Sequence, residues 1–213
     1  TLNLSESNSA VTITGTVGGD VKAGDTVTLT LFDGTTTSTY TDLVSLINGQ
    51  LGYSIEVPGS KLLSDSDHRL VASVSSSDAA GNTTTATSSR SYTLDTTAPK
   101  INAIVADWGS QLDGTESSTP NGITVNTEGV EDGRIVNLTL NNNTYAGVVS
   151  GNRAVITIGR NDLQALTDGS AYTMTATVSD AAGNASSNAS ATFEVTRGIP
   201  VVRFIGATAS GFT

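Results

Sequence analysis

The 213-residue sequence contains no cysteine, so neither disulfide bonds nor thiolate metal sites can stabilise its fold. Lack of cysteine does not assign a compartment, because many bacterial surface proteins also lack it. No apolar run approaches the ~18 residues of a membrane-spanning helix, which argues against direct membrane insertion. There is no initiator Met and no signal peptide, and the strand-like start at Thr1 leads us to expect a piece of a longer protein.

Positive charge and aromatic side chains are both scarce. Ten Lys and Arg residues stand against twenty Asp and Glu residues, which gives a net charge of −10. Phosphate backbones repel such a chain, so nucleic acid is a poor partner, whereas divalent cations suit it. Four Phe, five Tyr and one Trp offer few platforms for stacking sugars or bases. Thr, Ser and Gly are abundant instead, which predicts strands and turns with little helix.

An internal repeat organises the chain. The six residues Ser77–Asn82, Ser-Asp-Ala-Ala-Gly-Asn, recur letter for letter at Ser179–Asn184. Apolar residues alternate before both copies, as expected for strands. We therefore expect two repeats, residues 1–97 and 98–198, separated near Pro99, where proline prevents continued ladder pairing. Residues 199–213 resemble the start of repeat 2 and are either the first strand of a following repeat or a frayed tail.

Alternating apolar residues predict about seven strands in each repeat. In repeat 1 they fall at residues 10–17, 26–32, 36–44, 50–57, 69–76 and 86–94, with a short strand near 2–4. In repeat 2 they fall at residues 101–105, 122–128, 134–140, 143–149, 153–158, 171–179 and 190–196. One helical turn is expected near residues 60–63 and another near 161–166. Seven strands in about 100 residues predict an all-β fold of tandem immunoglobulin-like seven-stranded β-sandwiches.

Several motifs carry a resemblance to a known family. They are Val11–Asp20 (Val-Thr-Ile-Thr-Gly-Thr-Val-Gly-Gly-Asp), Ala23–Leu29 (Ala-Gly-Asp-Thr-Val-Thr-Leu), the two Asp-Ala-Ala-Gly-Asn loops and Asp95–Pro99 (Asp-Thr-Thr-Ala-Pro). Their order and spacing over nearly the whole chain resemble the bacterial Ig-like extender repeats of giant surface adhesins, including RTX-type biofilm adhesins exported by type I secretion. The resemblance implies a tandem rod module with Ca²⁺ at the junctions of repeats, located outside the cell or on its surface.

Strand order independently places the acidic loops. In a seven-stranded sandwich, the loops after strands two, four and six lie at the end that holds the N-terminus, so those of repeat 2 should face repeat 1. Carboxylates crowded there repel one another unless a cation neutralises them, and Ca²⁺ takes six to eight oxygen ligands. The residues expected near this junction are Asp65, Asp67, Asp95, Glu131, Asp132, Asp180 and Asn184.

The equivalent residues of repeat 1, among them Asp20 and Asp78, would face a preceding repeat and could form a second, half-built site. The alternative is that all these residues are ordinary solvated turn residues, since Asp, Asn and Gly favour turns for local reasons. At the exit of repeat 2, Arg197 stands in the segment that replaces Asp95–Pro99, which argues against a metal there.

No motif predicts an enzyme. His68 is the only histidine, and no Gly-x-Ser-x-Gly nucleophile elbow, P-loop or metalloprotease helix motif accompanies it. We expect a structural stalk module that is monomeric, contacts neighbouring repeats of its own chain and holds a distal adhesion domain away from the cell. The alternative is a ligand- or carbohydrate-binding Ig-like module, in which Trp108 would stack on a sugar. Core packing of Trp108 is the competing interpretation.

Overall fold

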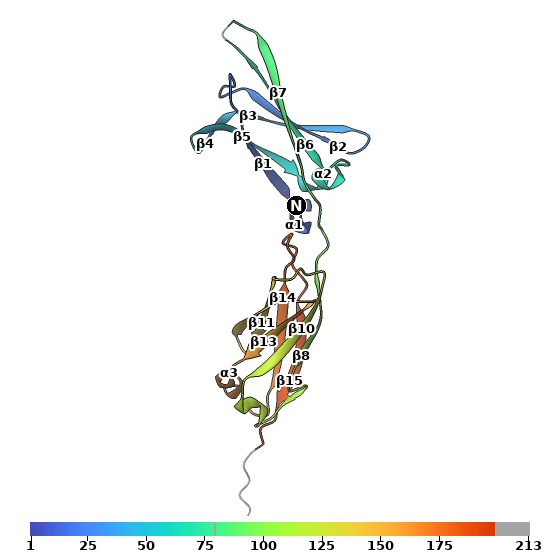
Figure 1. The fold of residues 1–213 in the computed structure, drawn as a ribbon, viewed down its shortest axis with the longest axis vertical. Helices are drawn as coiled ribbons and strands as arrows, with labels where there is room; N and C mark the ends of the chain where they lie inside the picture. Colours follow the sequence, from blue (N-terminus) through green and yellow to red (C-terminus); the bar gives the residue numbers. More distant parts are fainter. Residues whose placement is uncertain (79, 199–213) are drawn as a thin grey trace, which may run out of the picture. The chain divides into compact units, whose positions relative to one another are not determined.

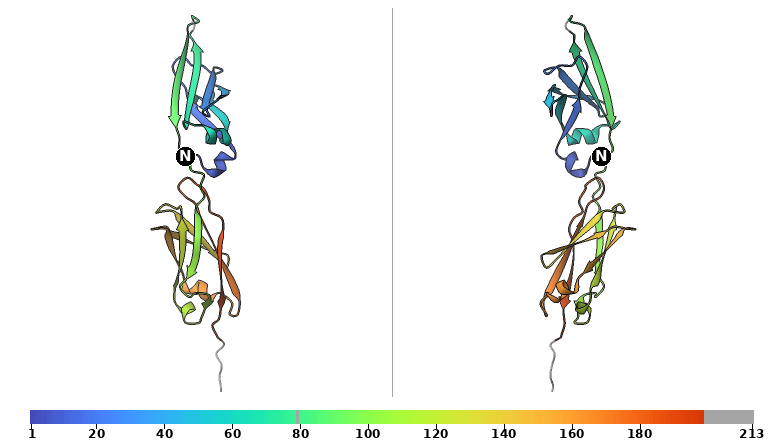
Figure 2. Two further views of the ribbon diagram at one scale, coloured as in Figure 1. Left: turned by 90° about the vertical axis from the view of Figure 1, so that its right-hand side faces the viewer. Right: turned by 60° about the vertical axis from the view of Figure 1, so that its left-hand side comes forward.

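The computed structural model describes residues 1–78 and 80–198, which form two compact units (Figure 1). Unit 1 comprises residues 1–98 together with the loop 179–185, and unit 2 comprises residues 99–178 and 186–198. The strand expected within residues 199–213 lies outside the described residues. Both units consist mainly of β-strands, which can be followed from two further directions in Figure 2.

Unit 1 is built from two antiparallel sheets, with strand orders β1-β5-β4 and β3-β2-β6-β7. A parallel bridge between Leu2 and Leu94 lies outside the named strands. The elements are α1 (Leu4–Ser7), β1 (Ala10–Thr16), β2 (Thr26–Phe32), β3 (Thr37–Leu43), β4 (Ser45–Ile47), β5 (Gln50–Pro58), α2 (Gly59–Ser64), β6 (Arg69–Ser77) and β7 (Thr83–Ser91).

Unit 2 has the strand orders β13-β10-β8 and β12-β11-β14-β15-β9. All pairs are antiparallel except β15 with β9. The elements are β8 (Lys100–Ala106), β9 (Gln111–Leu112), η1 (Glu116–Ser118), β10 (Asn121–Glu128), β11 (Ile135–Leu140), β12 (Asn143–Val148), β13 (Arg153–Ile158), α3 (Arg160–Gln164), β14 (Ala171–Val178) and β15 (Ala189–Val195).

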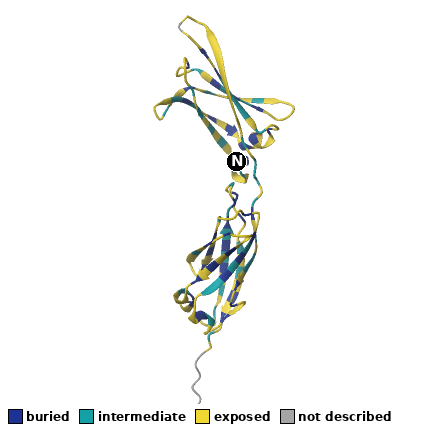
Figure 3. Ribbon diagram, viewed as in Figure 1, coloured by how far each residue is buried: buried dark blue, intermediate teal, exposed yellow. Residues whose placement is uncertain are grey.

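Period-two alternation positions the core of each unit between its sheets. In β2, Val27, Leu29 and Leu31 are at most 2% exposed while the residues between them face outward. The strand β11 repeats this pattern with alternating buried residues. Among the described residues, the core of unit 2 contains twenty buried apolar side chains and that of unit 1 ten, a difference visible in Figure 3. The predicted all-β sandwich fold is therefore confirmed, and the two sandwiches differ in how completely they are filled.

Two local predictions were wrong. The short strand expected near residues 2–4 is a single bridge at Leu2 followed by helix α1. The helix forms because the Asn3 side chain accepts a hydrogen bond from the Glu6 amide while the Glu6 carboxylate accepts one from the Asn3 amide, which is a capping box. The last strand of unit 1 begins at Thr83 rather than near residue 86.

Trp108 belongs to the core of unit 2. Its side chain is 5% exposed and its ring meets Phe193 edge-on, with centroids 5.2 Å apart and planes at 67°. Such pairs favour this geometry because the positive ring edge meets the negative ring face. The core-packing interpretation of Trp108 is confirmed. Among the described residues no helix is both long and apolar enough to cross a membrane.

Replacing Trp108 with Ala should destabilise unit 2 by about 3–5 kcal/mol, because the lost ring leaves a cavity beside Phe193. Urea unfolding of the full chain would show an earlier transition for unit 2. Val148→Ala is the matched control, since Val148 is 61% exposed and its truncation should change the free energy of unfolding by less than about 0.5 kcal/mol. Equal midpoints for the two variants would contradict the placement of Trp108 in the core.

Candidate functional site

The loop 179–185 is the strongest candidate site, and it is grouped with unit 1. The chain enters it from β14 and leaves it toward β15. Two of its polar residues are almost completely buried, with Asp180 2% and Asn184 3% exposed. Polar side chains are rarely buried without partners, so their hydrogen bonds decide what the loop does.

Within the loop, Asp180 holds the turn closed. Its Oδ1 accepts a hydrogen bond from the Asn184 amide, and its Oδ2 accepts one from Asn184 Nδ2, each at 2.8 Å. The Asp180 amide in turn donates to the Asn184 carbonyl. Gly183 has a φ of +91°, a conformation that side chains disfavour, which accounts for glycine in the motif. The first and last residues of Asp-Ala-Ala-Gly-Asn therefore clamp a tight turn.

Beyond the turn, the Asn184 side chain links the loop to the start of the chain and to the segment after β7. Its Oδ1 accepts a hydrogen bond from the Leu4 amide at 2.7 Å, and its Nδ2 donates to the Asp95 carbonyl at 2.9 Å. Because one partner is a donor and the other an acceptor, only one orientation of the amide satisfies both. Asn3 adds a further bond from its Nδ2 to the Ala182 carbonyl.

Of the residues predicted near the junction, Asp95, Asp180 and Asn184 are joined in unit 1 by the Asn184 side chain. Asn3, Leu4 and Glu6 were not predicted. Asn3 and Glu6 could have been found from their spacing, since an Asn followed three residues later by Glu is the signature of a capping box. Leu4 carries no such signal in the sequence, because it contributes only its backbone amide.

The copy of the loop in repeat 1 has the same internal hydrogen bonds in an exposed setting. The Asp78 carboxylate accepts bonds from the Asn82 amide, from Asn82 Nδ2 and from the Ala80 amide. These donors, chiefly the Asn82 side chain, favour the ionised form and lower the pKa of Asp78 below its ordinary 3.8. Both residues are exposed, unlike Asp180 and Asn184. Asp20 is also exposed, and its carbonyl accepts a bond from the Ser76 hydroxyl.

Asp65 has a different environment from the one expected for a metal ligand. It is 1% exposed, and its carboxylate accepts hydrogen bonds from the Phe32 amide at 3.1 Å and the Arg69 amide at 2.9 Å. The Tyr92 hydroxyl lies 2.8 Å from Oδ2, and burial together with this carboxylate raises the pKa of Tyr92 well above its ordinary 10.0. Asp65 therefore connects β2, β6 and the segment after β7, which is a structural role.

The remaining acidic candidates are exposed. Asp67 lies in the turn before β6. In unit 2, Glu131 and Asp132 lie in the turn between β10 and β11, where Asp132 Oδ1 accepts a hydrogen bond from the Gly151 amide at 2.8 Å. Among the described residues, no group of three or more His, Asp or Glu side chains lies close enough together to hold a metal ion.

The donor atoms of the loop nevertheless fit Ca²⁺ in kind. Asp180 supplies carboxylate oxygens, and the Asn184 side-chain carbonyl and the Asp95 backbone carbonyl lie within one hydrogen-bond network with it. Ca²⁺ prefers oxygen ligands from carboxylates and carbonyls. The two Asp180 oxygens each accept a bond from Asn184 and each retain a second lone pair. The loop thus provides an oxygen-rich setting without a complete set of acidic ligands.

His68 lies in a turn beside Tyr92. Its ring lies 5.8 Å from that of Tyr92, and its φ of +47° places it in a tight turn. Positive φ values outside glycine are uncommon and are tolerated mainly by residues such as Asn, Asp and His. The structure therefore gives His68 the role of a turn residue beside Tyr92.

Comparison with solved structures gives similarity over most of the chain. A Ca²⁺-stabilized adhesin that helps an Antarctic bacterium reach out and bind ice is 35% identical over 92% of this chain and 46% of its own, with a TM-score of 0.55. A structure of a 1.5-MDa bacterial ice-binding adhesin is 33% identical over 92% of this chain and 61% of its own, with a TM-score of 0.50. The chain belongs to the bacterial Ig-like repeats of large adhesins.

A bacterial immunoglobulin-like domain from the M. primoryensis ice-binding adhesin is 42% identical over 44% of this chain and 84% of its own, with a TM-score of 0.38. The present chain spans 46% and 61% of the lengths of the first two relatives, less than two thirds of each. No protein-family model matches the sequence, and no curated protein does so either.

Replacing Asn184 with Ala should destabilise unit 1 by about 1–3 kcal/mol, because the Asp180 carboxylate and the Leu4 amide lose a buried partner. Amide hydrogen exchange at Leu4 should become faster, and the melting temperature should fall. Asn82→Ala is the matched control, because Asn82 ends the identical six-residue sequence in repeat 1. It removes hydrogen bonds within an exposed loop and should lower the melting temperature less. If the two variants lose stability equally, Asn184 does not link the loop to Leu4.

Removing the Asn82 side chain should raise the pKa of Asp78 toward 3.8, because the hydrogen bond from the Asn82 side-chain amide is the largest cause of the lowered pKa. Because the pKa is lower in the folded loop, the associated stabilisation is present above the ordinary pKa and disappears as the pH falls through the folded value. NMR titration of the carboxyl carbon in Asn82→Ala measures the change. The pKa of Asp25, lowered mainly by the Lys22 amide, should stay constant and serves as the internal control.

Proposed function

We propose that the chain is part of the stalk of a large bacterial surface adhesin, where tandem Ig-like repeats hold a distal binding domain away from the cell. The observation that supports this most strongly is 33–35% identity to ice-binding adhesin structures over 92% of the chain. The proposed location is extracellular, on the cell surface, with neighbouring repeats of the same chain as partners and a monomeric state.

The composition of the two units is consistent with a spacer. Each has a hydrophobic core between two sheets, which is what an independently folding module needs. The net charge of −10 limits self-association, since like-charged surfaces repel. Adhesion in biofilms and export by type I secretion, as in RTX-type adhesins, belong to this proposal.

We also propose that Ca²⁺ stabilises the segment around Asp95. Asp95, Asp180 and Asn184 are the principal proposed ligands of the ion. Both Asp180 oxygens accept hydrogen bonds from neutral N–H groups, which solvate the buried charge without cancelling it. A divalent cation would cancel it and would join the loop to the segment after β7. The relative described as Ca²⁺-stabilized supports calcium as the ion.

The other acidic residues have different places in this proposal. Five of them are exposed, and they remain proposed as outer ligands or as members of half-built sites: Glu131, Asp132, Asp67, Asp20 and Asp78. Asp65 already accepts bonds from the Phe32 and Arg69 amides, so its contribution to a metal site would be secondary. A binding role through Trp108 is not favoured, because its ring is packed on Phe193.

Small-angle scattering of the full chain in EDTA and in a few millimolar Ca²⁺ tests the proposal, because extracellular calcium modules bind with Kd values of ~10⁻⁴–10⁻³ M. We expect a longer, stiffer particle in Ca²⁺ and a higher melting temperature. At a few millimolar Ca²⁺, Kd values in this range correspond to a stabilisation of roughly 1–2 kcal/mol. Asp180→Asn should abolish both changes, whereas Asp78→Asn, in the matched exposed loop, should retain them. Identical profiles with and without Ca²⁺ would refute stiffening by calcium.

A further inference from the structure

Helix α1 forms without a buried apolar face. It has only four residues, and isolated helices shorter than ~12–15 residues are marginal in water. Leu4 is 43% exposed, and of the four residues, all of which the structure describes, only Ser7 is buried. Apolar packing therefore does not account for this helix, and polar contacts on its two sides must do so.

One side of α1 contacts the loop 179–185, which belongs to the same unit. The amide of Leu4, the first residue of the helix, donates to Asn184 Oδ1 at 2.7 Å, and Asn3 Nδ2 donates to the Ala182 carbonyl at 3.2 Å. The first amides of a helix have no partner inside it, so their acceptors must come from elsewhere. The loop supplies the acceptor for Leu4, and it also contacts Asn3, which is the N-cap.

The other side of α1 lies against the start of helix α2 (Figure 1). The Gly59 amide donates to the Ser9 carbonyl at 2.7 Å, and a β-carbon at Gly59 would overlap the Glu6 carbonyl oxygen. Gly59 is the buried first residue of α2, and its φ is not positive, so backbone conformation does not require glycine there. The close approach of the α1 backbone explains the glycine instead.

The capping box alone does not specify this helix. In unit 2, Asp113 Oδ1 accepts a hydrogen bond from the Glu116 amide at 2.8 Å, and Glu116 Oε2 accepts one from the Asp113 amide at 3.1 Å. These reciprocal bonds match those of Asn3 and Glu6, yet the segment forms the 3₁₀ helix η1 rather than an α-helix. A capping box therefore permits more than one conformation, and other contacts select the α-helix in unit 1.

We propose that α1 is a conditional helix, ordered only while the loop 179–185 and α2 both hold it, and that its ordering couples the two. Loss of the Asn184 bond leaves the Leu4 amide without its acceptor, and the released turn then gives up its backbone contact with Gly59. Because coupling between two sites is reciprocal, displacing α1 at Gly59 loosens the loop in turn. The inference depends on neither the stalk function nor calcium.

The coupling reaches the core of unit 1 through α2. The Tyr92 hydroxyl donates to the Leu62 carbonyl of α2 at 2.7 Å and lies 2.8 Å from Asp65 Oδ2. A continuous set of contacts that contains one element with two states is a physical route between distant groups. Attachment of the loop is thereby transmitted from Asn184 through α1 to α2, and unit 1 is most stable while the loop is attached.

Amide hydrogen exchange of the full chain carrying Asn184→Ala tests this coupling. We expect at least tenfold faster exchange at Ser7 and Gly59, although neither amide bonds Asn184. Asn82→Ala, in the exposed copy of the loop, is the matched control and should leave both amides unchanged. Faster exchange at Leu4 alone would show that α1 forms without the loop, and the proposal would be overturned.

Gly59→Ala perturbs the same helix from its other side. Alanine favours helices more than glycine does, so propensity alone predicts a more stable α2. Because the added β-carbon overlaps the Glu6 carbonyl oxygen, we expect instead a melting temperature of unit 1 that is lower by several degrees, and at least tenfold faster exchange at Leu4. A higher melting temperature, or unchanged exchange at Leu4, would contradict the proposal.

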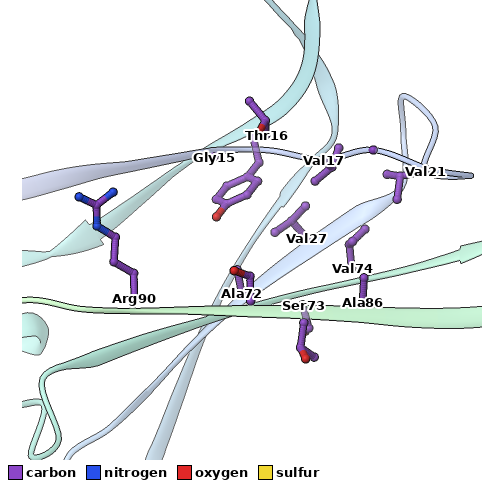
Figure 4. Close-up of a pocket in the computed structure, with 14 residues that line it drawn as sticks. Gly15, Thr16, Val17, Val21, Val27, Ala72, Ser73, Val74, Ala86 and Arg90 are labelled. Carbon is purple, nitrogen blue, oxygen red and sulfur yellow. The ribbon is translucent and has the colours of Figure 1, made fainter.

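Gly18→Ala is the matched control for this substitution. Gly18 lies beyond the end of β1, beside Val17 in the lining of a groove of about 410 Å³ (Figure 4). A β-carbon at Gly18 meets no atom within 4 Å. The control should therefore leave both the melting temperature of unit 1 and the exchange at Leu4 unchanged.

The double variant Asn184→Ala/Gly59→Ala distinguishes coupling from two separate losses. If each change releases α1, the second adds little, and the double variant melts close to the less stable single variant. Combining Asn184→Ala with Gly18→Ala should give changes in melting temperature that add. Additive losses in the first pair would overturn the proposal. Exchange in Asn184→Ala decides the question even where Gly59→Ala prevents unit 1 from folding.

Discussion

Burial of apolar side chains between two sheets is the interaction on which the whole structure depends, because no disulfide bond can replace it. Its strength follows the area removed from water, at roughly 25 cal/mol per Å² of apolar surface. Among the described residues, unit 2 buries twenty apolar side chains and unit 1 ten, so unit 2 has the larger share of this stabilisation. Side-chain contacts such as that of Asp65 add specificity to a framework that burial already provides.

Strand β8 accounts for much of the burial in unit 2, and no described residue of unit 1 occupies the corresponding place. The residues of β1 alternate as well as those of β10, and Ile13 has the same inward orientation as Ile123. What differs is the neighbour at the edge, since β8 covers Ile123 and no described strand covers Ile13 in the same way. Burial of a residue in a sandwich is thus decided by the completeness of the sheet as much as by its own strand.

The fold was largely predictable because period-two alternation and turn residues mark strands directly in the sequence, as in Val27–Leu31. Helix α1 was not predicted, since its capping box at Asn3 and Glu6 is a local signal that four residues of strand-like composition obscured. The site was predicted only in part. The residue types of the loop predicted a turn at Asp180. Its burial, and the hydrogen bonds of Asn184 to Leu4 and Asp95, depend on chain segments far away in sequence.

The two Asp-Ala-Ala-Gly-Asn loops separate what a motif determines from what its surroundings determine. In both, the aspartate accepts hydrogen bonds from the amide and side chain of the asparagine four residues later, so the sequence alone closes the turn. Only in the second copy does the asparagine also bond the Leu4 amide and the Asp95 carbonyl. A buried amide that satisfies a donor and an acceptor at once is selective for a partner that presents both. The same turn can therefore remain a solvated surface loop or become a point of attachment, depending on which backbone groups it meets.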